Sequence, residues 1–134
     1  MIITVCVDDK YGMMFNQRRQ SRDRVQQEDL LHWSAGRKLW MHTYSAALFQ
    51  DAGICVDDAF LEKAEPGDVC FVENLSIKEA ETKIEALILY RWNRTYPADA
   101  WLDLELSDFE LKETTEFTGS SHERITREIY YKKG

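Results

Sequence analysis

The sequence predicts an α/β domain with a mainly parallel central sheet, flanked by helices, that ends in a C-terminal antiparallel β-hairpin. Short continuous apolar runs, typical of buried parallel strands, alternate with helical patterns along the first two thirds of the chain. After Pro97 the helical patterns stop, and two alternating segments flank the turn-forming residues 118–121. With 134 residues, 44% of them hydrophobic, the chain fits one domain spanning 1–134.

In the first half of the chain, β-branched apolar runs predict strands, and residues with N-cap side chains predict helix starts. The expected elements are a strand over 2–7, a turn over 8–12, a helix that starts at Ser21 or Asp23 and ends at Gly36, a strand over 39–41, and a helix from Thr43 to residues 49–51.

The second half continues the alternation and then changes to strands alone. The expected elements are a strand over 54–56, a helix over 59–64 capped by Asp57 or Asp58, a central strand over 69–72, a helix that begins at Ser76 with Glu79 in a capping box, a strand over 85–92, and hairpin strands over 109–117 and 124–131.

The composition indicates a cytoplasmic protein without a membrane partner. No apolar run approaches the roughly 18 to 20 residues of a membrane-spanning helix. The N-terminal run lacks a basic segment and continues into Asp8 and Asp9, unlike a signal peptide. Cys6, Cys55 and Cys70 each lie within an apolar run, which predicts buried free thiols in a reducing compartment.

The acidic balance argues against broad, nonspecific nucleic-acid binding, because the net charge is −7 and the pI is near 5.0. The three histidines are scattered without metal-ligand spacing, so we predict no metal site. Residues 8–9 and 57–58 offer paired carboxylates that could hold a metal together. Turn formation and helix capping are the commoner uses of such residues.

One basic segment interrupts this acidic chain. Residues 18–24 contain four arginines, and residues 10–38 hold seven Lys/Arg against three Asp/Glu. Arginine forks suit phosphate and carboxylate groups, and N–H groups at the following helix start would add to anion binding. We therefore predict a ligand site formed by Asn16, Arg18, Arg19, Arg22 and Arg24. The alternative is that these arginines pair with the acidic remainder of the chain.

Several segments resemble dihydrofolate reductase. Residues 2–12 look like the family's first strand and the glycine that opens its active-site loop. Residues 38–49 are similar to its second strand and following helix, and residues 56–59 resemble the short helix before the cofactor-binding strand. The C-terminal third, from residue 84 to the hairpin that ends at Tyr131, matches the last three strands. The resemblance implies a dihydrofolate reductase-like fold.

The chain departs from this family on the cofactor side. Glu73 and Asn74 stand where a Gly-Gly pair lets the backbone approach the cofactor pyrophosphate, and a carboxylate repels phosphates. The Gly-Arg pair expected before His42 is absent. The chain is also shortened between Phe49 and Val56, where strands that contact the adenosine half belong. These departures predict that the protein uses no NADPH and no other cofactor.

The substrate side departs from the family as well. Asp29 matches the helix carboxylate that holds the pterin ring, so we add it to the candidate ligand-binding residues. Tyr90, however, stands where a threonine completes the hydrogen bonding of that carboxylate. This replacement predicts altered pterin recognition.

We therefore predict a protein that binds a small anionic ligand, nucleotide-like or pterin-like, on a shortened reductase-like fold and is not an active dihydrofolate reductase. One alternative is an enzyme of altered specificity that acts on a nucleotide or pterin. Another is an RNA or protein interaction module that uses residues 18–24 as its contact.

Overall fold

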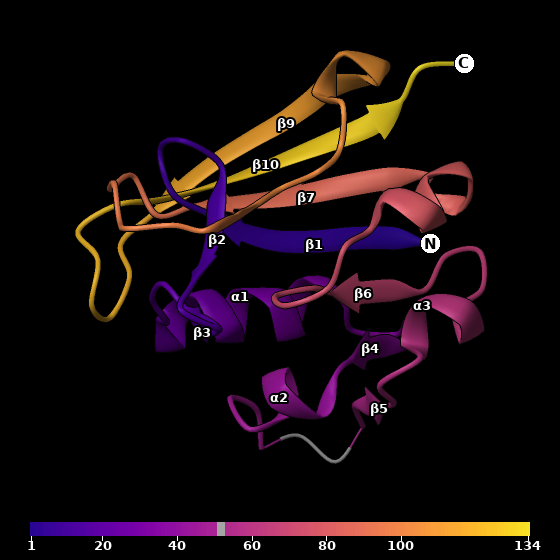
Figure 1. Ribbon diagram of the computed structural model, residues 1–134, viewed down its shortest axis with the longest axis horizontal. Helices are drawn as coiled ribbons and strands as arrows, with labels where there is room; N and C mark the ends of the chain where they lie inside the picture. Colours follow the sequence, from indigo (N-terminus) through magenta and orange to yellow (C-terminus); the bar gives the residue numbers. More distant parts are fainter. Residues whose placement is uncertain (51–52) are drawn as a thin grey trace.

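The central sheet is built around the first strand of the chain. The computed structural model describes residues 1–50 and 53–134, and within them a seven-stranded sheet has the order β5-β4-β6-β1-β7-β10-β9 (Figure 1). The strands are β1 (Ile2–Val7), β4 (Leu39–Met41), β5 (Cys55–Val56), β6 (Val69–Phe71), β7 (Ala86–Arg91), β9 (Phe109–Phe117) and β10 (Ile125–Lys132).

Strand directions confirm the predicted fold class. β1 pairs in parallel with both β6 and β7, and β4 pairs in parallel with β5 and β6. β10 pairs antiparallel with β7 and with β9, so the C-terminal hairpin forms one edge of the sheet. The parallel part is buried as its apolar runs predict, since β6 and most of β7 are inaccessible to solvent.

Short helices cover both faces of this sheet. They are α1 (Arg24–Trp33), α2 (Thr43–Ala46), α3 (Phe60–Lys63) and the 3₁₀ helices η1 (Lys78–Lys83) and η2 (Leu106–Asp108). α1 begins where the sequence predicts, because the Asp23 carboxylate accepts hydrogen bonds from the N–H groups of Val25 and Gln26. Within the described residues, no helix is long and apolar enough to cross a membrane.

The second predicted helix is shorter than expected. α2 ends at Ala46 and not at residues 49–51, and residue 51 lies outside the described residues. Its N-cap is His42, whose Nδ1 accepts from the N–H of Tyr44, and not Thr43. The Thr43 side chain instead donates to Asp58, on the neighbouring segment, so a tertiary contact replaces the predicted local cap.

Two other predicted caps are also wrong. The capping box at Ser76 does not form, because the Ser76 hydroxyl donates to Asp103 and the following turn is the 3₁₀ helix η1. α3 has Ala59 as its N-cap, and neither predicted aspartate caps it through a side-chain hydrogen bond. The Asp57 carboxylate accepts from the N–H of Ala59 itself, which lies before the helix.

A small second sheet was not expected from the sequence. It has the order β3-β2-β8 and consists of β2 (Gly12–Phe15), β3 (Arg18–Arg19) and β8 (Ala100–Trp101). Asn16 and Gln17 form the two-residue turn between β2 and β3, and both have positive φ values, 52° and 61°. Such turns usually have the sequence Asn-Gly. Here Gln17 takes the place of the glycine, so the sequence does not show the usual hairpin pattern. β2 lies at the end of the sheet toward which β1 points (Figure 1).

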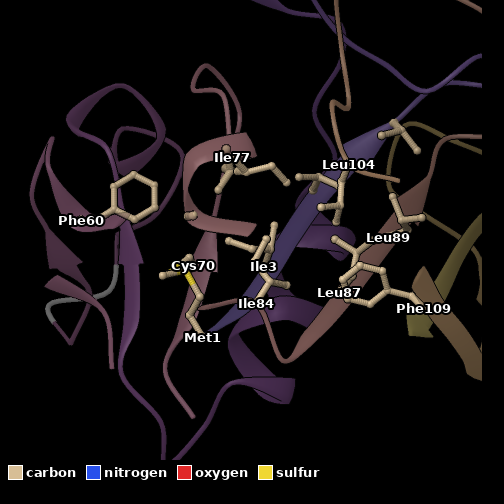
Figure 2. Close-up of a cluster of buried hydrophobic side chains, with 14 residues drawn as sticks. Met1, Ile3, Phe60, Cys70, Ile77, Ile84, Leu87, Leu89, Leu104 and Phe109 are labelled. Atoms are coloured by element: carbon tan, nitrogen blue, oxygen red, sulfur yellow. The ribbon is translucent and has the colours of Figure 1, made fainter. Parts of the chain in front are cut away.

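The core has two clusters, one on each face of the central sheet. Successive residues of a strand point to opposite faces, so β1 and β7 contribute to both clusters. Figure 2 shows the cluster that α3 and η1 cover, with Ile3, Leu87, Phe60 and Ile77. The other cluster includes Leu30 of α1 and Ile88 and Tyr90 of β7.

The cysteines are free, as predicted, but they differ in burial. Cys70 is fully buried in β6, and burial raises the pKa of its thiol to about 12. Cys6 and Cys55 are only partly buried. Cys55 lies in β5, the edge strand of the sheet that the described residues form, so its backbone has a strand partner on one side only among them.

Candidate functional site

A cleft of about 610 Å³ lies at the carboxyl end of the parallel strands, between the small sheet and the segment that follows β6. This end of an open α/β sheet is where ligands usually bind. Apolar and aromatic side chains form much of its wall, among them Met13, Met14, Leu75 and Trp101. Glu73, Asp99 and Asp103 also line it.

A charge pair borders the cleft through Glu73. The Arg19 guanidinium donates from Nε to Glu73 Oε2 at 2.9 Å and from its terminal nitrogen to Glu73 Oε1 at 3.1 Å. The Glu73 side chain is 8% exposed and that of Arg19 is 20% exposed. Arg19 also lies over the Tyr44 ring, 4.3 Å from its centroid, and its backbone N–H donates to the Tyr44 hydroxyl. Burial lowers the pKa of Arg19, but Glu73 outweighs it and the net shift is upward.

A second charged group joins α1 to the last strands of the sheet. Asp29 accepts two hydrogen bonds from Arg127, at 2.8 and 2.9 Å, and one from the Tyr90 hydroxyl at 2.6 Å. Tyr90 is fully buried, and burial together with the Asp29 carboxylate raises the pKa of its hydroxyl far above the usual range. Tyr90 is therefore a neutral donor. The carboxylate that was predicted to hold a ligand already accepts three hydrogen bonds from two side chains of the protein itself, Arg127 and Tyr90.

A third group fixes the loop between β9 and β10 onto the start of α1. Besides the helix N–H groups, the Asp23 carboxylate accepts from the N–H groups of Ser120 and Ser121 and hydrogen-bonds His122 Nδ1 at 3.0 Å. Burial raises the pKa of Asp23, but these hydrogen bonds outweigh it and hold the pKa well below its ordinary value. The His122 ring stacks on Trp92, with centroids 4.5 Å apart.

The four arginines of residues 18–24 do not converge on one point. Arg19 contacts Glu73, whereas Arg18 is exposed in β3 next to the exposed Asn16. Arg22 and Arg24 border a different hollow of about 390 Å³, beside the end of α2, and Arg24 also pairs with Glu28 at 3.5 Å. Ligand binding by these residues stays a prediction, but only Arg22 and Arg24 border a common hollow.

The N–H groups at the start of α1 are already bonded, contrary to the expectation that they would add to an anion site. Those of Val25 and Gln26 donate to Asp23, and that of Arg24 donates to the Ser120 hydroxyl. The reason is tertiary: the loop between the last two strands brings a second set of polar groups to this helix end.

Sequence reasoning missed the residues that line the cleft from residues 99–103. Asp99, Ala100, Trp101 and Asp103 all line it, so no single alternating face marks the segment. The available signal was the two aspartates on either side of Trp101 after Pro97. Tyr44, which stacks on Arg19, carried no such signal, because only the folded chain brings α2 to β3.

The paired aspartates serve turns and caps in the described part of the chain. Asp8 accepts from the N–H groups of Lys10 and Gly12, and Asp57 pairs with Lys63. Burial raises the pKa of Asp8, but these N–H donors and others lower it by more. Among residues 1–50 and 53–134, no three His, Cys, Asp or Glu side chains are grouped as a metal site requires.

Comparisons with known proteins identify the fold. The sequence matches no protein-family model, and a search of curated proteins also gave no match. Its structure is similar to that of a dihydrofolate reductase from Enterococcus faecalis complexed with NADP(H) and RAB-propyl, with a TM-score of 0.71 and 11% sequence identity. The similarity covers 99% of this chain and 96% of that chain. The chain therefore has a dihydrofolate reductase-like fold, as the resemblance of its motifs implied.

Proposed function

We propose that this protein binds a small organic molecule in the cleft beside Glu73 and has no NADPH-dependent reductase activity. The observation that carries the proposal is the ion pair between Arg19 and Glu73. It occupies the position after β6 where the reductase family has Gly-Gly beside the cofactor phosphates. The paired side chains leave no room for the close backbone approach that Gly-Gly allows, and the charge of Arg19 is already satisfied by Glu73 and is not free to bind phosphate.

The substrate side supports the same conclusion. In the reductase resemblance, Asp29 would hold the pterin ring. Here Tyr90 and Arg127 occupy both oxygens of its carboxylate. A pterin would have to displace Arg127, whose one terminal nitrogen donates to both oxygens, and a fully buried tyrosine hydroxyl, and each lost charge-assisted hydrogen bond costs roughly 1.5 to 3 kcal/mol.

What favours binding over a purely structural role is the cleft itself. Its volume of about 610 Å³ lies within the usual range for small-molecule sites, roughly 300 to 1,000 Å³. Its walls combine apolar side chains with a few polar groups, which is the composition typical of such sites.

A second candidate function is binding of a small anion at the hollow bordered by Arg22 and Arg24. The specific observation is that both guanidinium groups border one hollow of about 390 Å³ together with Gln27 and Ser120. The Arg24 side chain is 72% exposed, so each contact there is worth less than about 1 kcal/mol. This makes the cleft the better-supported site.

The proposal is tested by calorimetry and by a thermal-shift screen. NADPH should give no binding heat at concentrations that saturate ordinary reductases, and no dihydrofolate turnover should be measurable. Small molecules from the screen that stabilise the protein should lose this effect when Ala100→Phe fills the cleft. Leu111→Phe, on the exposed face of β9, is the control and should keep it. Micromolar NADPH binding, or hits unaffected by Ala100→Phe, would contradict the proposal.

A further inference from the structure

The charges around the cleft indicate which class of ligand it binds, if the proposed function holds. Of the three carboxylates that line it, Glu73 is neutralised by Arg19. Asp99 accepts from the backbone N–H of Asn16, and Asp103 accepts from the hydroxyl of Ser76 and the N–H of Ile77. These donors are neutral, and neither aspartate forms an ion pair with any described residue.

The acidic character continues beyond the cleft. An adjoining hollow of about 310 Å³ shares Leu75 and Ser76 with it. This hollow is lined by Asp58, Glu62 and Glu79, with Lys83 as its single basic lining residue among those described. A ligand that enters along this side of the molecule therefore meets a negative potential, which attracts cations and repels phosphates and carboxylates.

The apolar wall determines the rest of the ligand. Trp101 is 54% exposed and lies between Asp99 and Asp103 in the chain, and Met13 and Met14 also line the cleft. An exposed indole offers a face to a planar apolar body and also attracts a cation through its ring electrons. Thioether side chains adapt to irregular apolar shapes.

We propose that the cleft binds a small organic cation, an amine carried on a planar apolar body. The ammonium group would lie between the Asp99 and Asp103 carboxylates, and the apolar body would lie against Trp101 and the methionines. This inference rests on the proposed function, because it assigns a ligand class to the same cleft.

The test uses three probes that share an indole ring and differ in charge: tryptamine, tryptophol and indole-3-acetate. Calorimetry should show tryptamine binding at least about tenfold more tightly than tryptophol, and indole-3-acetate binding most weakly. Raising the salt concentration should weaken tryptamine binding and leave tryptophol binding nearly unchanged, because only the cation depends on the carboxylates.

Variants test whether the preference for tryptamine depends on the two aspartates of the cleft. Asp99→Asn with Asp103→Asn keeps one acceptor oxygen at each position but removes both charges, and it should abolish the preference for tryptamine over tryptophol. Glu110→Gln with Glu116→Gln changes the net charge equally on exposed β9, and it should leave the preference intact. The salt series uses the wild-type protein and so provides a result even where a variant folds poorly.

The outcomes separate the two proposals. Equal affinity for the three probes, or tightest binding of indole-3-acetate, overturns the cation assignment while leaving a small-molecule site in place. Equal loss of preference in both double variants also overturns it. If no probe binds and no compound in the screen stabilises the protein, both the ligand class and the proposed function fall.

Discussion

At the scale of single residues, Arg19 and Glu73 are each other's main partner. Glu73 is more than nine-tenths buried, so removal of Arg19 leaves an uncompensated charge in a poorly solvated place. The arginine that was predicted to bind an anion from solution therefore already binds one from the protein.

Arg19→Ala should lower the free energy of unfolding by about 2 to 3 kcal/mol, because the buried Glu73 carboxylate loses a bidentate partner. Urea unfolding measures the loss. Arg18→Ala, its exposed neighbour in β3, is the control and should change stability by less than about 0.5 kcal/mol. Adding Glu73→Gln to Arg19→Ala should recover part of the loss. Equal stability of the two single arginine variants would show that the ion pair contributes little.

Tyr90→Phe should destabilise the protein by about 1.5 to 3 kcal/mol, since it removes the hydroxyl that donates to the Asp29 carboxylate and nothing replaces it in the core. Tyr131→Phe, at an exposed tyrosine of β10, is the matched control. If both variants unfold at the same urea concentration, Arg127 alone is sufficient to stabilise the Asp29 carboxylate.

At the scale of elements, Asp23 joins two segments distant in the chain. The same carboxylate caps α1 and holds the loop over residues 118–124, so the start of the helix and the turn of the hairpin are stabilised together. Because the carboxylate is buried, its replacement affects both elements.

Asp23→Asn should lower the free energy of unfolding at pH 7 by about 3 kcal/mol, because an amide cannot accept from all these donors. The folded-state pKa of Asp23 is depressed, so its stabilisation is complete above the unfolded value of about 3.9 and is lost as the pH falls below it. The difference from the wild type should therefore shrink between about pH 5 and pH 2.5 in urea unfolding. Asp9→Asn, at an exposed carboxylate, serves as control. A difference independent of pH would argue against this role.

The turn between β2 and β3 contains a residue in an unfavourable conformation. Gln17 has a φ of 61°, which glycine adopts without steric strain. Gln17→Gly should raise the free energy of unfolding by about 0.5 to 1 kcal/mol. Asn16→Gly should change it less, because asparagine tolerates this region. Thermal unfolding of the two variants measures this difference. A lower melting temperature for Gln17→Gly would mean that the Gln17 side chain makes stabilising contacts at the cleft.

At the scale of the whole molecule, β1 couples the two core clusters. Ile3, Val5 and Val7 belong to one cluster, and Ile2 belongs to the other. β7 is shared in the same way, so neither face of the sheet can lose its packing without affecting the other. We therefore expect residues 1–134 to behave as one cooperative unit.

Urea unfolding followed by tryptophan fluorescence and by far-ultraviolet circular dichroism should give coincident transitions. Trp40 and Trp92 lie on different sides of β1 in the sheet order, so fluorescence samples both ends. Two separated transitions would show that the C-terminal hairpin unfolds independently and would contradict a single domain.

Elements whose signals are local could be predicted from the sequence. The β-branched run of β1, the side chain of Asp23 before α1 and the alternation in β9 each act over a few residues. Together with the chain order, they define an α/β sheet with an antiparallel edge. The predicted caps that were wrong, at Thr43 and Ser76, are those where the side chain bonded a distant segment.

The pairing of the charges, in contrast, depends on the tertiary fold. Arg19 and Glu73 are 54 residues apart, and Asp29 and Arg127 are 98 residues apart. Their separations in space depend on the strand order and on the small sheet that the sequence did not reveal. A long charged side chain bonds whichever opposite charge the fold brings within reach, and no local pattern encodes that choice. For this reason the arginines could be recognised from the sequence, but their partners and the acidic cleft could not.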